Sequence, residues 1–527
     1  MSVFPDVVIQ GAVALLLFGF GFWAGAQAWH HTLTQFAGAF VTDPAVALSS
    51  LFWRPEVPSL SVDMAFEDYQ YLVEGRERAL TSGANLFSDT SYVSASASLD
   101  QGGAVPVLMG LLEAPAKDFE GARWPFQMAA SGDELLGEMQ RAMLTPSEGD
   151  SVLSWGYLEA LRQADFVAPR YSLIHLVING HPWGLYVMEE LPSTTMAERA
   201  GRAPDVLIAF FDSRDFLEAS ALLGKLPAAE GFAYAQMDAA RAVRLSREER
   251  LEALEGDTEL AAARNEALAL LRAVETGEKL PSEVFDPQQM GHFLALTAFW
   301  RGTSSLDWTS LSLLYDPAAH RFEPVGTGMT PRNETALPRF LLDDPEIQRV
   351  YIRELAKLSR DPALPEGGAT SLEKLHLAVS SELGYPPSPE VLLSAHQAWA
   401  RRLLAPAFIL SAEAYEASGM LFLRLANVQT FPVEVLGLDL GEKAFVLLDP
   451  GWLAASDHGR VVAASEGVVL RAFSGDPESG VTLLIPLTAL PAEATELRVV
   501  ARPWGVTEGQ SFVQVRDGFA PLGEAGR

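Results

Sequence analysis

The chain has 527 residues, which is too long for one hydrophobic core and predicts two or three domains. Its 38 basic and 68 acidic residues give a formal net charge of −30. Such a surface repels phosphate, so a nucleic-acid partner is not expected. The sequence contains no cysteine, which excludes disulfides, thiolate metal sites and cysteine nucleophiles.

The first segment, from Val7 to Trp29, carries no charged residue and would, as a helix, cover the ~30 Å hydrocarbon core of a membrane. It also holds the small residues and interfacial tryptophans typical of membrane helices: Gly11, Gly19, Trp23 and Trp29. We therefore expect residues 1–32 to be a transmembrane anchor. A cleaved signal peptide is the alternative, because AGAQAW at 24–29 offers small residues for cleavage.

A linker rich in small residues and proline follows at 33–57. Beyond it, SLSVDMAF at 59–66 alternates like a strand, and the next stretch has helical spacing. Two apolar runs in YSLIHLVINGHPWGLYVMEEL at 171–191 flank an Asn-Gly pair, one of the strongest hairpin signals. Asn179 and Gly180 are therefore predicted to be turn residues.

The remainder of the chain divides near Gly419. Before it, helical patterns alternate with a predicted hairpin formed by LSLLY and RFEPV. After it, short apolar runs at turn-rich intervals predict an antiparallel β-sandwich over 419–527. The expected fold class is thus α+β, with a domain at 58–415 that one transmembrane helix precedes and a β-sandwich follows.

Four blocks in the central region resemble the CotH kinase family, named for a bacterial spore-coat protein kinase with a diverged kinase-like fold. They occur in the family's order and cover roughly residues 58–360: PSLSVDMAFEDYQYL, GARWPFQM, YSLIHLVINGHPWGLYVMEEL and HFLALTAFWRGTSSLDWTSLSLLYDPAAHRFEPVG. In the third block, Gly184, Tyr186 and Glu190 match a glycine-hydrophobic-tyrosine strand that ends in glutamate. The resemblance implies a distantly kinase-like domain at 58–415, in a membrane-anchored branch that carries a C-terminal β-domain.

The resemblance also implies where a phosphoryl-transfer site would lie, and this chain departs from it there. The block that carries the family's strand lysine reads Gly-Leu-Leu-Glu, with Leu112 in the basic position. Gln127 stands where the family tends to have arginine, and Arg123 is the nearby residue that would compensate. The family's catalytic aspartate falls near Asp307, and its following asparagine near Thr309 and Ser310, so Asp307 is either the base or a turn residue.

The metal strand departs furthest from the family pattern. Pro324 is followed by Gly326 and Gly328 where the family has aspartates, and glycine supplies no oxygen ligand for a divalent cation. Glu190 matches the glutamate that pairs with the strand lysine. Because that lysine is missing, Glu190 is expected to pair with an arginine or to be exposed, and the adjacent Glu189 is the alternative for the same position.

These losses act on one transition state and together predict that phosphoryl transfer has been lost. We expect a pseudokinase-like accessory subunit without a cofactor, which binds a protein partner, as in a larger membrane complex. The expected location is a bacterial inner membrane, spanned once, with the bulk of the chain outside the cytoplasm.

Two rival functions remain open. The first is a divergent ATP-dependent protein kinase or nucleotide-binding protein with Mg or Mn, which would recruit ligands from other loops, such as Asp307, Asp316 or Glu323. The second is an envelope module that binds a glycan or polymer through aromatic side chains of the β-sandwich. Candidate aromatic residues are Phe422, Phe445 and Trp504.

Overall fold

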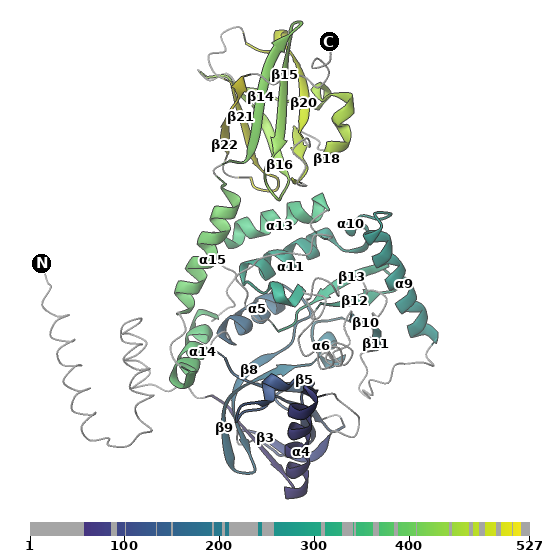
Figure 1. The fold of residues 1–527 in the computed structure, drawn as a ribbon, viewed down its shortest axis with the longest axis vertical. Helices are drawn as coiled ribbons and strands as arrows, with labels where there is room; N and C mark the ends of the chain where they lie inside the picture. The colour runs from purple at the N-terminus through teal and green to yellow at the C-terminus, as the bar shows by residue number, and fades with distance from the viewer. Residues whose placement is uncertain are drawn as a thin grey trace, which may run out of the picture.

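The structure is a computed structural model that describes the chain between residues 57 and 517. Within that range it leaves out 86–91, 101, 133, 149–150, 192–193, 203–205, 210–240, 245–257, 307–310, 329–340, 342–343, 362–367, 384–387, 407, 442–444, 463–466, 474–479, 492–496 and 508–509. Figure 1 shows three parts along the long axis. They are a β-barrel, a middle body of helices with a small sheet, and a C-terminal pair of sheets.

The N-terminal part is a closed barrel of seven strands in the order β1-β3-β4-β6-β7-β9-β8. Neighbouring strands are antiparallel except at the closing seam, where β1 pairs parallel with β8 and Leu60 lies opposite Leu176. Alternate apolar side chains such as Val62 and Met109 are fully buried and form its core. The strands are β1 (Ser59–Met64), β3 (Val93–Leu99), β4 (Val105–Leu111), β6 (Phe126–Ala130), β7 (Arg141–Pro146), β8 (Tyr171–Ile178) and β9 (His181–Glu190).

The turn between β8 and β9 also holds the seam. Asn179 (φ 49°) and Gly180 (φ 76°) both have positive φ, as a tight two-residue hairpin turn requires. The Asn179 side-chain Oδ1 accepts a hydrogen bond from the backbone N–H of Met64 over 2.8 Å, and the Asn179 N–H donates to the Val62 carbonyl over 2.9 Å. The turn residue therefore joins the end of β1 to the end of β8.

Two further positions of this hairpin are structural. Gly184 has φ 93° and lies at a bulge where the register of β8 and β9 shifts, next to Leu176. Tyr186 is fully buried, and its hydroxyl donates to the Trp124 carbonyl over 3.1 Å. Both residues therefore set the path of β9, which continues to the candidate site.

The middle body contains a four-stranded antiparallel sheet in the order β11-β10-β12-β13, packed with helices. One of its helices begins at a local capping signal: Asp344, before Pro345, caps α13 by accepting the N–H groups of Glu346 and Ile347 at 2.8 and 3.2 Å. The strands are β10 (Val206–Ala209), β11 (Arg241–Arg244), β12 (Ser312–Asp316) and β13 (Arg321–Val325). The helices are α5 (Ser151–Gln163), α6 (Thr194–Arg199), α9 (Thr258–Glu275), α10 (Pro281–Val284), α11 (Pro287–Phe299), α13 (Pro345–Leu358), α14 (Gly368–Leu383) and α15 (Pro389–Leu404).

The C-terminal part consists of two sheets that bury leucine and valine side chains between them, including Leu423 and Val435. One sheet has the order β20-β15-β14-β23, and the other β18-β19-β16-β21-β22 with β17 beside β16. Their strands are β14 (Leu410–Ala417), β15 (Met420–Asn427), β16 (Val433–Asp439), β17 (Phe445–Leu447), β18 (Val461–Val462), β19 (Val468–Leu470), β20 (Val481–Pro486), β21 (Arg498–Pro503), β22 (Ser511–Gln514) and β23 (Arg516–Asp517).

The expected fold class was wrong. The described part of the chain is mixed α/β, with a closed seven-stranded barrel and several further sheets, whereas we expected an α+β fold behind one transmembrane helix. Closure was missed because it depends on the pairing of β1 with β8, which apolar periodicity does not encode. The single transmembrane helix is not supported: no helix among the described residues is long and apolar enough to span a bilayer. The segment 7–29, with Gly11, Gly19, Trp23 and Trp29, lies outside those residues.

Candidate functional site

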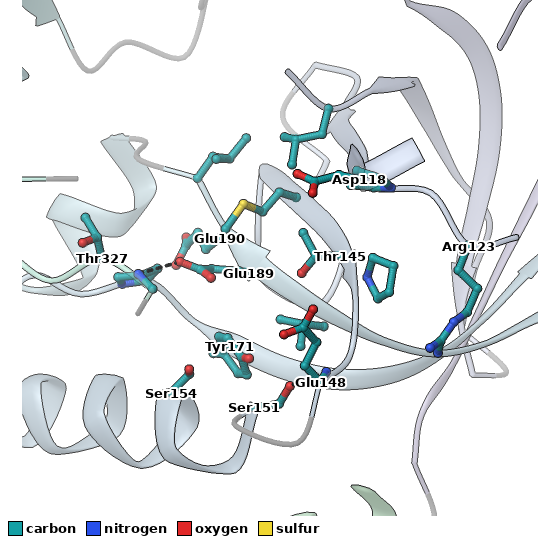
Figure 2. Close-up of a pocket in the computed structure, with 18 of the residues that line it drawn as sticks. Asp118, Arg123, Thr145, Glu148, Ser151, Ser154, Tyr171, Glu189, Glu190 and Thr327 are labelled. Atoms are coloured by element: carbon teal, nitrogen blue, oxygen red, sulfur yellow. Dashed lines mark hydrogen bonds between the residues drawn. The ribbon is translucent and has the colours of Figure 1, made fainter. Parts of the chain in front are cut away.

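A cavity of about 780 Å³ lies where the barrel meets the middle body, and we call it the central cavity. Its walls come from β7 and β9, from the loop that follows β4, from the start of α5 and from the segment after β13. Figure 2 shows acidic and hydroxyl side chains around this space, with Arg123 further away at the right of the view. The polar lining residues are Lys117, Asp118, Arg123, Thr145, Glu148, Ser151, Ser154, Tyr171, Glu189, Glu190 and Thr327.

Glu189, near the end of β9, lies deep in this cavity and is 6% exposed. Its Oε1 accepts a hydrogen bond from the backbone N–H of Gly328 over 2.8 Å. Burial raises the pKa of the Glu189 carboxyl to about 7, although the hydrogen bond from Gly328 lowers it. Glu189 therefore changes charge near neutral pH.

The close approach of this carboxylate requires glycine at 328. A Cβ placed on Gly328 would lie 2.3 Å from Glu189 Oε2 and 2.4 Å from Oε1. A Cβ on Gly326 would lie 2.7 Å from a Leu161 methyl and 2.8 Å from the Ala168 Cβ. Both positions are therefore filled by neighbours, and neither has room for the aspartate that the family's metal strand carries.

Glu190 is 2% exposed and is paired with an arginine, one of the two outcomes expected from the sequence. Its Oε2 accepts the guanidinium of Arg199, from α6, and the backbone N–H of Arg170 over 3.1 Å. Its Oε1 is buried and finds no hydrogen-bond partner in the described part of the chain. A buried acceptor without a hydrogen bond lowers the stability of the folded protein by about 1–3 kcal/mol, and by more when the acceptor is charged.

The mouth of the central cavity is exposed and carries charges of both signs. Lys117 and Asp118 belong to the 3-10 helix η2 (Ala116–Phe119), and Glu148 lies just before α5. Partial burial raises the pKa of Asp118, Lys117 lowers it and Glu148 raises it further. Arg123 is half-buried on the same wall and donates to the Leu185 carbonyl over 3.4 Å.

The remaining family positions are only partly brought together. Leu112, at the position that the resemblance matches to the family's lysine, lines the cavity with an apolar side chain. Gln127 is buried on β6 opposite Met143, and its Nε2 has no partner among the residues described. Asp307 and Ser310 lie outside the described residues.

Two of the acidic residues that the kinase rival would recruit, Asp316 and Glu323, serve local structure. Asp316 Oδ1 accepts from the backbone N–H of Ala318 over 2.8 Å within its own turn. Glu323 accepts from Arg202 Nε over 2.8 Å. Neither residue lines the central cavity, and no group of three or more His, Asp or Glu side chains in the described ranges is arranged to hold a metal ion. Among the described residues that follow Pro324 (325–328), none supplies an anionic oxygen for a divalent cation.

The aromatic candidates of the C-terminal part differ from one another. Phe422 stacks on Tyr415 with ring centroids 4.6 Å apart, and Trp504 lies under the Arg349 guanidinium of α13 at 5.3 Å. Phe445 is 49% exposed. The three side chains therefore have different local partners, which does not favour a shared sugar-binding surface.

Several residues of the site were missed by sequence reasoning. Asp118, Glu148 and Thr327 carry no motif, and only the folded chain brings them to one cavity. From the sequence, Glu189 was only the alternative to Glu190 for the family's glutamate position. Searches against protein-family models and against curated proteins each found no match to this chain.

Proposed function

We propose that this chain is a non-catalytic relative of the CotH kinases that acts as an accessory subunit and binds a protein partner. The observation that carries the proposal is the contact between Glu189 and Gly328. This contact leaves no room for a side chain at position 328, which the resemblance matches to a metal-ligand position of the family. Without a bound divalent ion, the charge that develops on a transferred phosphoryl group is not neutralised.

The electrostatics of the cavity support the same conclusion. Four carboxyl groups line it: Asp118, Glu148, Glu189 and Glu190. Glu190 already pairs with Arg199 and burial raises the pKa of Glu189 to about 7, so Asp118 and Glu148 are the acids that offset the cationic side chains of Lys117 and Arg123. A nucleoside triphosphate is itself strongly anionic and would find the cationic side chains of the cavity offset by nearby acids, with no metal site among the described residues. The cavity is therefore better suited to a ligand that is not an anion.

Calorimetry on the full chain tests the loss of catalysis. We expect no metal-dependent binding of ATP in the presence of Mg or Mn, and no change with Asp307→Ala. Gentle purification from the native source should retain a partner in fixed stoichiometry. Micromolar ATP binding that requires the metal, or a pure monomer, would contradict the proposal.

A divergent nucleotide-binding protein is the second candidate, because Lys117 and Arg123 line the same cavity and present cationic groups for phosphate. On this alternative, Lys117→Met and Asp307→Ala would each abolish ATP binding. The matched variant Lys279→Met, which removes a lysine just before α10 and outside the central cavity, would leave ATP binding intact.

A further inference from the structure

Two buried oxygens at the deep end of the central cavity have no partner among the described residues. They are Glu190 Oε1 and the Thr327 hydroxyl. Figure 2 shows Thr327, Glu189 and Glu190 at the same end of the cavity. A bound group that donates several hydrogen bonds would satisfy these acceptors and offset the cost of their burial.

We propose that the central cavity binds an organic cation, through a guanidinium or primary ammonium group seated against Glu190, Glu189 and Thr327. The inference rests on the proposed function, since it assigns a ligand class to the cavity of that accessory subunit. Both groups carry a positive charge and several N–H donors, and a guanidinium can engage a carboxylate with two parallel bonds.

Charge at the deep end favours a cation over a neutral donor. Glu189 and Glu190 are both buried there, while the existing counterion, the Arg199 guanidinium, engages only Glu190 Oε2. The second carboxylate, Glu189, meets only a backbone N–H in the hydrogen bonds that the structure gives it. A cation bound between them would stabilise the ionised form of Glu189.

The walls suit the carbon chain that such a group carries. Leu112, Met143, Val187 and Met196 line the same cavity and present apolar surface to a methylene stem. No described group of acidic or histidine side chains is arranged for a metal ion, so the geometry favours an organic cation over a bare divalent one. The cation is either a free amine or the basic side chain of a partner protein.

Calorimetry on the full chain with defined probes tests the inference. The probes are agmatine, the peptide acetyl-Gly-Arg-Gly-amide and the same peptide with citrulline, the uncharged isostere of arginine. We expect agmatine and the arginine peptide to bind and the citrulline peptide to bind at least tenfold more weakly. Tighter binding of agmatine identifies a free amine as the ligand, and tighter binding of the peptide identifies a partner side chain.

Variants locate the site. Glu189→Gln should weaken binding at least tenfold and remove its rise with pH between 6 and 8, a pH readout that a purely structural role would not change. Thr327→Val, which removes a hydroxyl without changing the volume greatly, should weaken binding severalfold even if Glu190→Gln fails to fold. Glu134→Gln, on the exposed surface, is the matched control and should leave binding unchanged.

The outcomes separate this inference from the proposed function. If neither cationic probe binds, or if the citrulline peptide binds equally well, the inference is wrong while the accessory role stands. If ATP with Mg binds in the same cavity and the cations do not, both are wrong.

Discussion

The Glu189 carboxylate and the Gly328 backbone N–H are joined by a 2.8 Å hydrogen bond, although 139 positions separate them in the sequence. The contact links the end of β9 to the segment after β13, and so connects the barrel to the middle body. It also places a buried acid where the resemblance predicted metal ligands. Two predictions follow from this contact, one from the Asn179 turn and one from the Asp344 cap.

Replacing Gly328 by alanine should destabilise the protein. The added Cβ would lie within 2.4 Å of both Glu189 oxygens, and a buried carboxylate cannot retreat without losing its hydrogen bond. We expect a loss of about 1–3 kcal/mol, read from urea unfolding followed by tryptophan fluorescence. Gly103→Ala is the matched control, because a Cβ there meets nothing within 4 Å. Equal stability of the two variants would show that the contact between Gly328 and Glu189 has room for a methyl group.

The free energy of unfolding should fall as pH rises from about 4.5 to about 7, because Glu189 is buried and its pKa is raised. Its carboxyl has a raised pKa of about 7 when folded, against an ordinary value of 4.5, so the folded chain holds the proton over that range and the unfolded chain releases it. The contribution is on the order of 3 kcal/mol, present below pH 4.5 and lost above pH 7.

The measurement for this prediction is the difference in unfolding free energy between wild type and Glu189→Gln at several pH values, which cancels the other titrating groups. Glutamine keeps an acceptor for the Gly328 N–H and carries no proton. Exposed Glu134→Gln should track wild type throughout. A Glu189→Gln variant with an unchanged pH profile would mean that the carboxyl is solvated.

The stability of variants at Asn179 should depend on whether they keep the hydrogen bond to Met64 and the positive φ of the turn. Asn179→Asp retains the acceptor for the Met64 N–H and should be tolerated best. Asn179→Gly keeps the positive φ and loses the side-chain bond, while Asn179→Ala loses the bond and strains the turn. We expect alanine to cost about 1–2 kcal/mol in thermal or urea unfolding. If alanine equals aspartate, the seam does not depend on this side chain.

Asp344 should matter more than an ordinary helix cap. It is fully buried, caps α13 through Oδ1, and its Oδ2 accepts the Ser282 N–H over 2.8 Å, which ties α10 to α13. Asp344→Ala should therefore cost about 2–3 kcal/mol, more than the ~1 kcal/mol of a cap alone. Asp286→Ala, which removes the half-exposed cap of α11, is the comparison and should cost less. The reverse order in urea unfolding would contradict the role of the buried bond.

The amino-acid sequence by itself determined the local features of this protein. Asn179-Gly180 specified the hairpin turn and Asp344-Pro345 the start of α13, because turns and caps depend on neighbouring residues. It also showed that Gly326 and Gly328 cannot supply carboxylate ligands. Only the tertiary structure decided that the first sheet closes into a barrel and that Glu189 turns toward Gly328. Closure and burial arise from pairings between distant segments, whose register and packing no local pattern fixes.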